Sequence, residues 1–178
     1  MKKLFLSVIA VFGVYSFSNA QVGKIQKISL GTDFALPLGD SGDTYSFGYG
    51  ASAKGEFKLM EKLNLTASAG YMHFSLKKDI RDLLKYFGDD TKGSGAIPLK
   101  VGATYYFLQK LYVGAEAGAA ISTDEEGGTA FTYTPTVGTN IRISEKYGLD
   151  IGLRFEGWSR NGINQNFIGL RTAFAFKP

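Results

Sequence analysis

The sequence contains no cysteine, four prolines, one histidine and one tryptophan among its 178 residues. The lack of cysteine excludes a disulfide scaffold and any thiolate metal site. No phosphate-binding loop, metal-ligand cluster or nucleic-acid motif is present, so we expect no cofactor, no metal and no nucleic-acid partner. What the chain has instead is 23 glycines and 24 Phe and Tyr residues, a composition typical of closely packed strands.

Long apolar runs are also scarce, apart from one at the N-terminus. Lys2 and Lys3 precede the apolar run Leu4–Phe17, and small residues follow it as far as Ala20. This pattern predicts a signal peptide over the first twenty residues, cleaved between Ala20 and Gln21. The alternative, an N-terminal membrane anchor, is less favoured because polar and charged residues follow at once.

The mature chain, residues 21–178, suits a single domain with a dominant sequence period of two. Between residues 44 and 59, apolar and small side chains alternate strictly with polar ones and glycines. The same alternation recurs in seven further segments of roughly ten residues, enough for a tilted strand to cross a bilayer. Their apolar faces span residues 28–36, 63–71, 97–107, 111–121, 131–141, 149–155 and 168–176.

The connections between these segments alternate in length. Short turns are expected at 60–62, 108–110 and 144–147, and longer links at 37–43, 72–95, 122–128 and 159–164. Short turns at one end and long loops at the other are typical of an outer-membrane barrel. The sequence therefore predicts an all-β fold, an eight-stranded antiparallel up-and-down transmembrane β-barrel. With the N-terminus in the periplasm, the long loops lie outside the cell.

Alternation alone does not decide which face points outwards, because a soluble lipocalin-like barrel also has one apolar face. The polar face carries ten glycines, which a solvated surface does not need but a narrow lumen does. The apolar face ends in aromatic residues at both rims, as expected at the two interfaces of a bilayer. A membrane barrel is therefore favoured over a soluble periplasmic ligand-binding barrel.

The segments Ile97–Phe107 and Leu111–Ala115 resemble the outer-membrane β-barrel domain family, relatives of the small OmpA and OmpX barrels. The ending Phe174-x-Phe176 is similar to the aromatic signal read by the barrel-assembly machinery. The resemblance implies a location in the outer membrane, with outer-membrane lipids and that machinery as partners. Family members serve as envelope anchors, adhesins or resistance factors, and a few are enzymes, so the fold leaves the role open.

Nine charged residues share the parity of the polar face and are candidates for a charge network in the lumen. Buried ions must be paired, so we expect salt bridges that fill the interior, with Arg142 near Asp150. Trp158 has the same parity and is expected to close the outer mouth. The nine are Lys54, Glu56, Lys100, Glu116, Arg142, Asp150, Arg154, Glu156 and Arg171.

A candidate catalytic pair is His73 with Ser75, which is similar to the pair of the lipid A deacylases; Asp79 is the nearest candidate for an orienting carboxylate. A second motif, residues 79–87, has helical spacing of apolar residues among basic ones. This helix either touches the anionic outer leaflet or a partner, or caps its own barrel. We expect a non-conducting, non-enzymatic protein with a structural or surface-interaction role and an unidentified surface partner. A lipid A-modifying enzyme of the same fold is the alternative.

Overall fold

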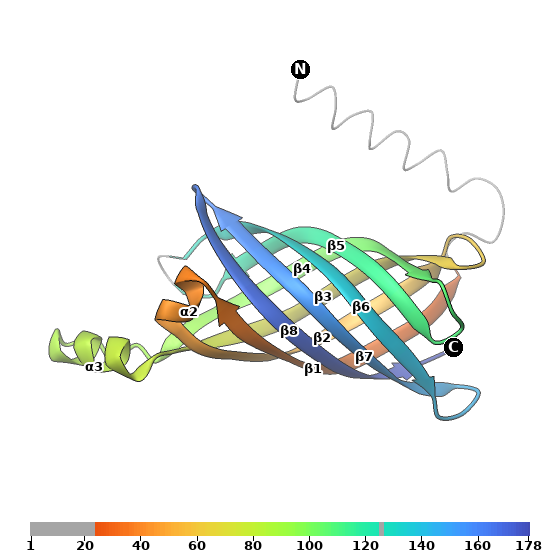
Figure 1. Ribbon diagram of the computed structural model, residues 1–178, viewed down its shortest axis with the longest axis horizontal. Coiled ribbons are helices and arrows are strands. Elements are labelled where there is room, and N and C mark those ends of the chain that lie inside the picture. Colours follow the sequence, from red (N-terminus) through yellow and green to blue (C-terminus); the bar gives the residue numbers. More distant parts are fainter. Residues whose placement is uncertain (1–23, 125–126) are drawn as a thin grey trace, which may run out of the picture.

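The computed structural model describes residues 24–124 and 127–178, which form a closed barrel of eight antiparallel strands (Figure 1). Each strand pairs with the next one along the chain, and β1 closes the barrel by pairing with β8. The strands are β1 (Ile25–Leu38), β2 (Tyr45–Lys58), β3 (Leu63–Leu76), β4 (Gly93–Tyr106), β5 (Leu111–Ser122), β6 (Thr129–Arg142), β7 (Tyr147–Arg160) and β8 (Ile163–Phe176). The expected fold class is confirmed.

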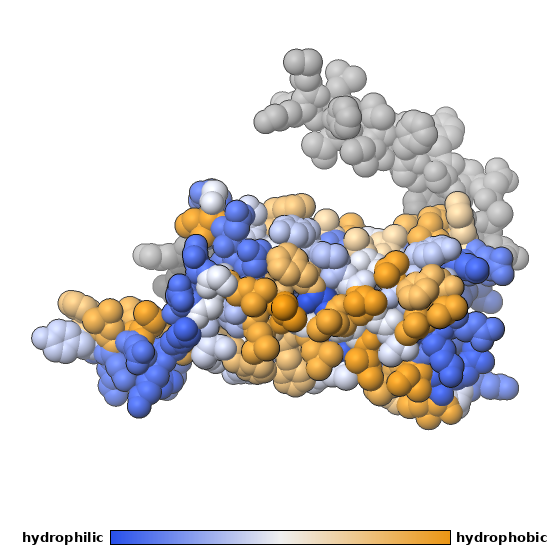
Figure 2. Space-filling view, viewed as in Figure 1, coloured by the Kyte–Doolittle hydropathy of each residue, from blue (hydrophilic) through white to orange (hydrophobic). Residues whose placement is uncertain are grey.

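The alternation of side chains turns the apolar face outwards. In β4, Val101 is 67% exposed, whereas the preceding residue, Lys100, is 6% exposed. On the face shown in Figure 2, apolar side chains predominate over the middle of the barrel, and hydrophilic ones gather towards its two ends. A closed barrel satisfies its backbone hydrogen bonds internally, so this surface can face lipid.

The strands extend further into the loops than the sequence pattern indicated. The prediction of a long loop at 159–164 is wrong, because β7 and β8 are joined by only Asn161 and Gly162. These two residues have φ angles of 50° and 83°, as in the two-residue turns that match the twist of a hairpin. The Asn-Gly pair was the signal for this turn. The loop expected at 72–95 is also shorter, since β3 continues to Leu76 and β4 begins at Gly93.

Two helices lie at the loop end of the barrel. The short α2 (Asp40–Thr44) lies beside β8, where the Ser41 hydroxyl accepts a hydrogen bond from the Asn166 N–H at 3.3 Å. The longer α3 (Lys78–Tyr86) projects beyond the barrel and buries none of its residues (Figure 1). The helix itself was expected, but its role as a cap on its own barrel is contradicted. No helix in the described ranges is long and apolar enough to cross a membrane.

Candidate functional site

The interior of the barrel holds ten charged side chains of balanced sign, five basic and five acidic. They come from six strands, because every second residue of a strand faces the lumen. An eight-stranded barrel is just wide enough for side chains to fill its interior, so these groups must contact one another. They are Lys27, Lys54, Lys100, Arg154 and Arg171, with Asp33, Glu56, Glu116, Asp150 and Glu156.

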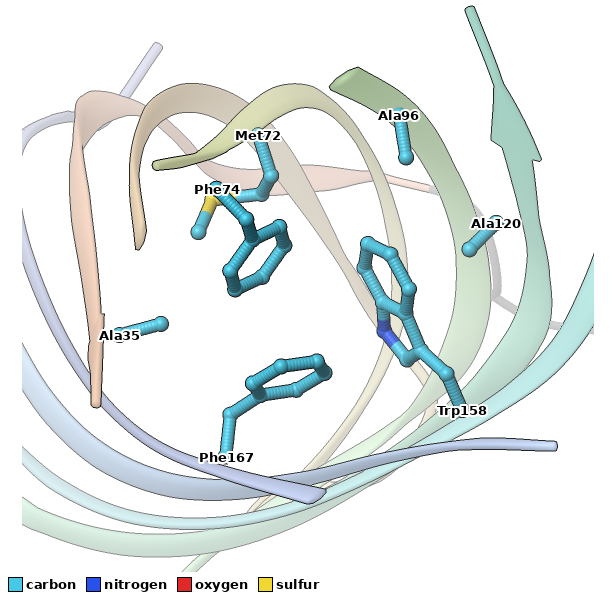
Figure 3. Close-up of a cluster of buried hydrophobic side chains, with 7 residues drawn as sticks. All are labelled: Ala35, Met72, Phe74, Ala96, Ala120, Trp158 and Phe167. Carbon is cyan, nitrogen blue, oxygen red and sulfur yellow. The ribbon is translucent and has the colours of Figure 1, made fainter. Parts of the chain in front are cut away.

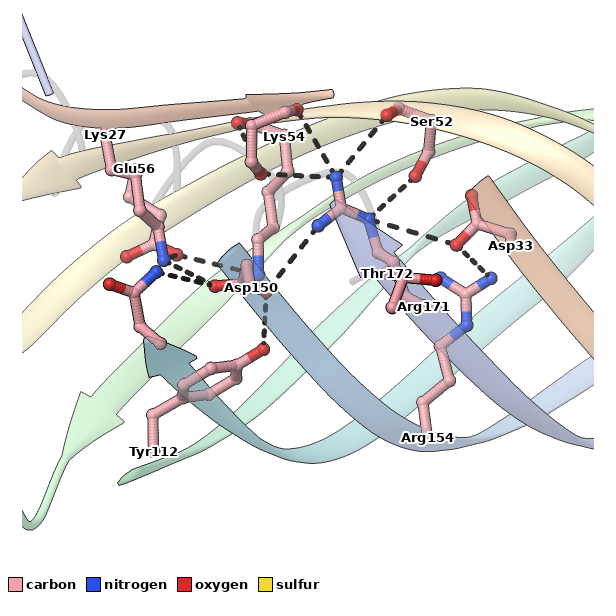
Figure 4. A network of polar contacts seen from close by, with 12 residues as sticks. Lys27, Asp33, Ser52, Lys54, Glu56, Tyr112, Asp150, Arg154, Arg171 and Thr172 are labelled. Atoms are coloured by element: carbon pink, nitrogen blue, oxygen red, sulfur yellow. Dashed lines mark hydrogen bonds and ion pairs between the residues drawn. The ribbon is translucent and has the colours of Figure 1, made fainter. Parts of the chain in front are cut away.

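The turn half of the lumen is organised around Lys27, which is 3% exposed. Its ammonium lies 2.7 Å from Glu56 Oε1 and 2.7 Å from Asp150 Oδ2 (Figure 4). The Tyr106 hydroxyl accepts a hydrogen bond from Lys27 at 2.8 Å and donates one to Glu56 at 2.9 Å. The Tyr112 hydroxyl donates to the other oxygen of Asp150 at 2.8 Å. One cation thus bridges two carboxylates, and each carboxylate has a phenol as a second partner.

Tyr112 reaches Asp150 because two glycines leave room for its side chain. It starts on β5 and crosses Gly138 of β6 towards Gly152 of β7. A Cβ atom at Gly138 would collide with the Tyr112 ring, and one at Gly152 would lie 3.0 Å from the hydroxyl oxygen. Glycine is therefore required at Gly138 for the tyrosine to take this position.

Arginines join the turn half to the middle of the lumen. Arg171 Nη1 lies 3.7 Å from Asp150 Oδ1, and its Nε donates a hydrogen bond to the Ser52 hydroxyl at 2.9 Å. The same Nε lies 3.9 Å from Asp33 Oδ1, which also forms a 2.9 Å ion pair with Arg154 Nη2 (Figure 4). Asp33 is 1% exposed and lies between the two guanidinium groups.

The network continues to the loop half through Glu156. Its Oε2 lies 3.4 Å from Arg154 Nε, and its Oε1 lies 3.2 Å from Lys100 Nζ. Lys100 also donates to the Thr134 hydroxyl at 3.1 Å, and the indole N–H of Trp158 donates to Glu156 at 2.8 Å. We call this continuous set of contacts, from Lys27 to Trp158, the lumen network.

Around Trp158, aromatic side chains pack across the lumen (Figure 3), and an open cavity of about 350 Å³ bordered by Trp158 lies at the loop end. The rings of Phe74 and Phe167 stack with their centroids 4.5 Å apart, and each lies 5.4 Å from the Trp158 ring. Phe74, Phe167 and Trp158 are at most 7% exposed and form what we call the aromatic plug. It separates the charged lumen from the loop end, as was expected for Trp158.

Seven of the nine charged residues predicted for the lumen form ion pairs there, and Arg142 is an exception. Arg142 is exposed at the turn end, where it lies opposite Gly148; the residue opposite Asp150 is Asn140. The expected Arg142–Asp150 pair is therefore wrong. The register of the β6–β7 hairpin places Arg142 beyond the closed part of the lumen, and Lys27 from β1 takes its place beside Asp150.

Glu116 is the second exception, because it faces the lumen without an ion pair among the described residues. It lies on β5 between Gly102 of β4 and Thr134 of β6. Its Oε1 is buried without a hydrogen-bond partner and borders a central cavity of about 30 Å³. A polar cavity of this size can hold one or two water molecules.

Four members of the lumen network were not predicted from the sequence: Lys27, Asp33, Tyr106 and Tyr112. Lys27 was left out because the first strand was expected to begin at Ile28, whereas β1 begins three residues earlier. Asp33 and Tyr112 have polar-face parity, and Tyr106 follows the outward-facing Tyr105, so alternation alone could have found all four.

The structure gives the proposed catalytic pair no supporting geometry. His73 faces outwards on β3 with its ring 5.4 Å from that of Tyr49, and no hydrogen bond joins it to Ser75 in the described chain. Asp79 lies on the projecting helix α3. The predicted cleavage site at Ala20 and Gln21 lies outside the described residues and stays a prediction.

The comparisons with known proteins agree on the fold. No family model and no curated protein matches the sequence. Neisserial surface protein A (NspA) has a similar structure with a TM-score of 0.61 and 12% identity, over 85% of this chain and 96% of that one. OprG of Pseudomonas aeruginosa gives 0.56 and 11%, over 90% and 99% of the two chains. Ail, the attachment invasion locus protein of Yersinia pestis, gives 0.54 and 11%, over 86% and 99%. With its outward apolar face, this chain has the fold of the small eight-stranded outer-membrane barrels.

Proposed function

We propose that this protein is a non-conducting, non-enzymatic barrel of the outer membrane with a structural or surface-interaction role. The observation that carries the proposal is the filling of the middle of the lumen, between the open cavities at its two ends. The lumen network occupies the turn half and the middle, and the aromatic plug occupies the loop half. An ion crossing this path would have to separate buried pairs, at a cost of several kcal/mol for each uncompensated charge.

Single-channel recording in a planar bilayer tests the absence of conduction. We expect no steady conductance from the wild-type protein, and none from Trp158→Phe, which keeps an aromatic ring in the plug. Large and steady conductance from the wild-type protein would contradict the proposal and make the lumen a transport path.

The absence of catalysis is supported by the surroundings of His73. A hydrolase of this type needs a nucleophile, a base and an orienting carboxylate within hydrogen-bond reach. Mass spectrometry of lipid A from cells with and without the protein, and with His73→Ala, tests the enzymatic alternative. A change in lipid A that requires His73 would overturn the non-enzymatic assignment.

The projecting helix α3 supports a surface-interaction role. Leu83, on the apolar face of the helix, is 56% exposed, and Phe87, directly after its last residue, is 75% exposed. The adjacent polar face carries Lys78, Arg81 and Lys85. We propose that outer-membrane lipids surround the barrel, that the barrel-assembly machinery inserts it, and that a surface partner contacts α3 outside the cell. Deletion of residues 77–92 should leave insertion intact and abolish binding of that partner.

A further inference from the structure

The two ends of the barrel differ strongly in charge. The turn end carries seven basic residues and two acidic ones, whereas the lumen is neutral and the loop end carries more acidic residues than basic ones. The N-terminal residues 1–23, which the structure leaves undescribed, include no Asp or Glu and so add no negative side chain. The charged residues of the turn end are Lys24, Lys58, Lys62, Lys110, Arg142, Lys146 and Lys177, with Glu61 and Glu145.

Four of these cations surround an open cavity of about 740 Å³ at the turn end, which we call the turn-side cup. The four, Lys58, Lys62, Arg142 and Lys177, lie at the end of β2, in the β2–β3 turn, at the end of β6 and just after β8. The floor of the cup includes Lys27. The charge of Lys27 is already balanced by Glu56 and Asp150. The surplus positive charge of the cup therefore lies on the four wall cations.

The wall cations have no acidic partner within the described residues, since none of the four takes part in an ion pair there. Partial burial, together with the positive charges of Arg142 and Lys27, lowers the pKa of Lys177. Partial burial and two neighbouring cations thus both disfavour the charged form of Lys177. Two carboxylates also border the cup: Glu61 of the β2–β3 turn, and Glu56, which is paired with Lys27.

The backbone at the rim of the cup is held in place by hydrogen bonds between neighbouring strands. Lys58 N–H donates to Lys24 C=O at 3.1 Å, Tyr106 N–H to Lys62 C=O at 2.8 Å, and Lys177 N–H to Lys146 C=O at 2.8 Å. The backbone positions from which the cationic side chains extend are therefore fixed, which removes part of the entropic cost of binding an anion.

We propose that the turn-side cup binds a phosphate-bearing anion. Several cations around one cavity suit a group that offers several acceptor oxygens and more than one negative charge, and Arg142 adds a planar donor pair that matches a phosphate. Asn64 and Asn140 also line the cup, but their amide nitrogens already donate hydrogen bonds to Glu56 and Asp150, so the wall cations are the main donors. The phosphate can belong to a soluble anion or to the headgroup of an anionic phospholipid, which offer the same chemistry.

Titration calorimetry with inorganic pyrophosphate tests the proposal, with the full-length mature barrel folded in zwitterionic detergent at constant ionic strength. We expect saturable binding of one pyrophosphate per barrel. The double variant Arg142→Gln, Lys177→Gln should weaken this binding by about tenfold or more, because it removes two charge-assisted contacts. The matched control is Lys110→Gln, Lys146→Gln, which removes the same charge from the same end but outside the cup. The control should change the affinity by less than about twofold, as expected for screened charges at a distance.

Two results would overturn the proposal: absence of saturable binding by the folded wild-type protein, or an equal loss in the cup variant and the control. Folding of each variant is verified by heat-modifiable gel mobility. Repetition in nanodiscs identifies the source of the phosphate. A lower pyrophosphate affinity in phosphatidylcholine discs that contain phosphatidylglycerol than in pure phosphatidylcholine discs would show that lipid headgroups occupy the cup. Equal affinities would assign the cup to a soluble anion.

Discussion

Removal of the negative charge of Asp150 should destabilise the barrel far more than removal of the negative charge of Glu116, a lumen carboxylate without an ion pair among the described residues. Asp150 is fully buried and accepts contacts from Lys27 at 2.7 Å and from the Tyr112 hydroxyl at 2.8 Å. Asp150→Asn keeps the size of the side chain but leaves Lys27 with a single carboxylate partner, Glu56. Breaking a buried pair costs about 3–5 kcal/mol, and the remaining Glu56 contact places this variant near the lower end, about 3 kcal/mol.

Glu116→Gln is the matched control, because it also neutralises one lumen carboxylate without a change of size. Glu116 has no ion pair to lose among the described residues. Its charge is only a desolvation cost, so the variant should be neutral or more stable, within about 1 kcal/mol. The double variant Lys27→Gln, Asp150→Asn should recover little of the loss caused by Asp150→Asn, because Lys27 also bridges the buried Glu56, whose remaining ion pair is with Lys54 at 3.6 Å.

Urea unfolding in lipid vesicles, with the folded fraction read from gel mobility, measures these differences. For a slope of about 1–3 kcal/mol per molar urea, a loss of 3 kcal/mol lowers the midpoint by roughly 1–3 M. Equal midpoints for Asp150→Asn and Glu116→Gln would refute the reasoning, because they would mean that the paired and the unpaired carboxylate make the same contribution. A stable Asp150→Asn barrel with new conductance would refute it in another way, by showing that the network closes the lumen without stabilising it.

Three further predictions test the outer face, one turn and the orientation. Val101→Arg should block insertion into vesicles, since a charge at the middle of the lipid face costs about 2–4 kcal/mol, while Val101→Leu should insert normally. Gly162→Val should lower stability by about 1–2 kcal/mol in the same urea assay, because Gly162 has a φ of 83° that a β-branched residue does not tolerate. Protease added to whole cells should cut first within residues 77–92, around the exposed helix α3; cleavage confined to the turns at 59–62 or 107–110 would reverse the orientation.

Much of the fold follows from sequence periodicity alone. Strict alternation defines both the strands and the face of each residue, so the parity of Val101 and Lys100 predicted which of them faces lipid. A period of two allows no intermediate orientation, and a shift by one residue would turn every apolar side chain inwards. The same parity correctly predicted that Lys54, Glu156 and Arg171 lie inside the barrel.

Which charged residues pair with one another in the lumen could be seen only in the tertiary structure. Asp150 pairs with Lys27 of β1, which is 123 positions away in the chain and comes close only when the barrel closes. Sequence patterns can pair residues only across hairpins, and they therefore assigned Arg142 to Asp150. Arg142 lies at the turn-side cup instead, because the hairpin register and the closure of the sheet together decide the height of each side chain along the lumen.

The sequence by itself thus determined the number of strands, the face that meets lipid and the presence of charges of both signs inside. These properties depend on local alternation and composition, which do not change when distant strands come together. The tertiary structure decided which charges neutralise one another, which described cations at the turn end stay without a partner, and that α3 extends away from the barrel. Those outcomes depend on the closure between β1 and β8 and on the stagger of all eight strands, a global constraint that no segment of the chain contains.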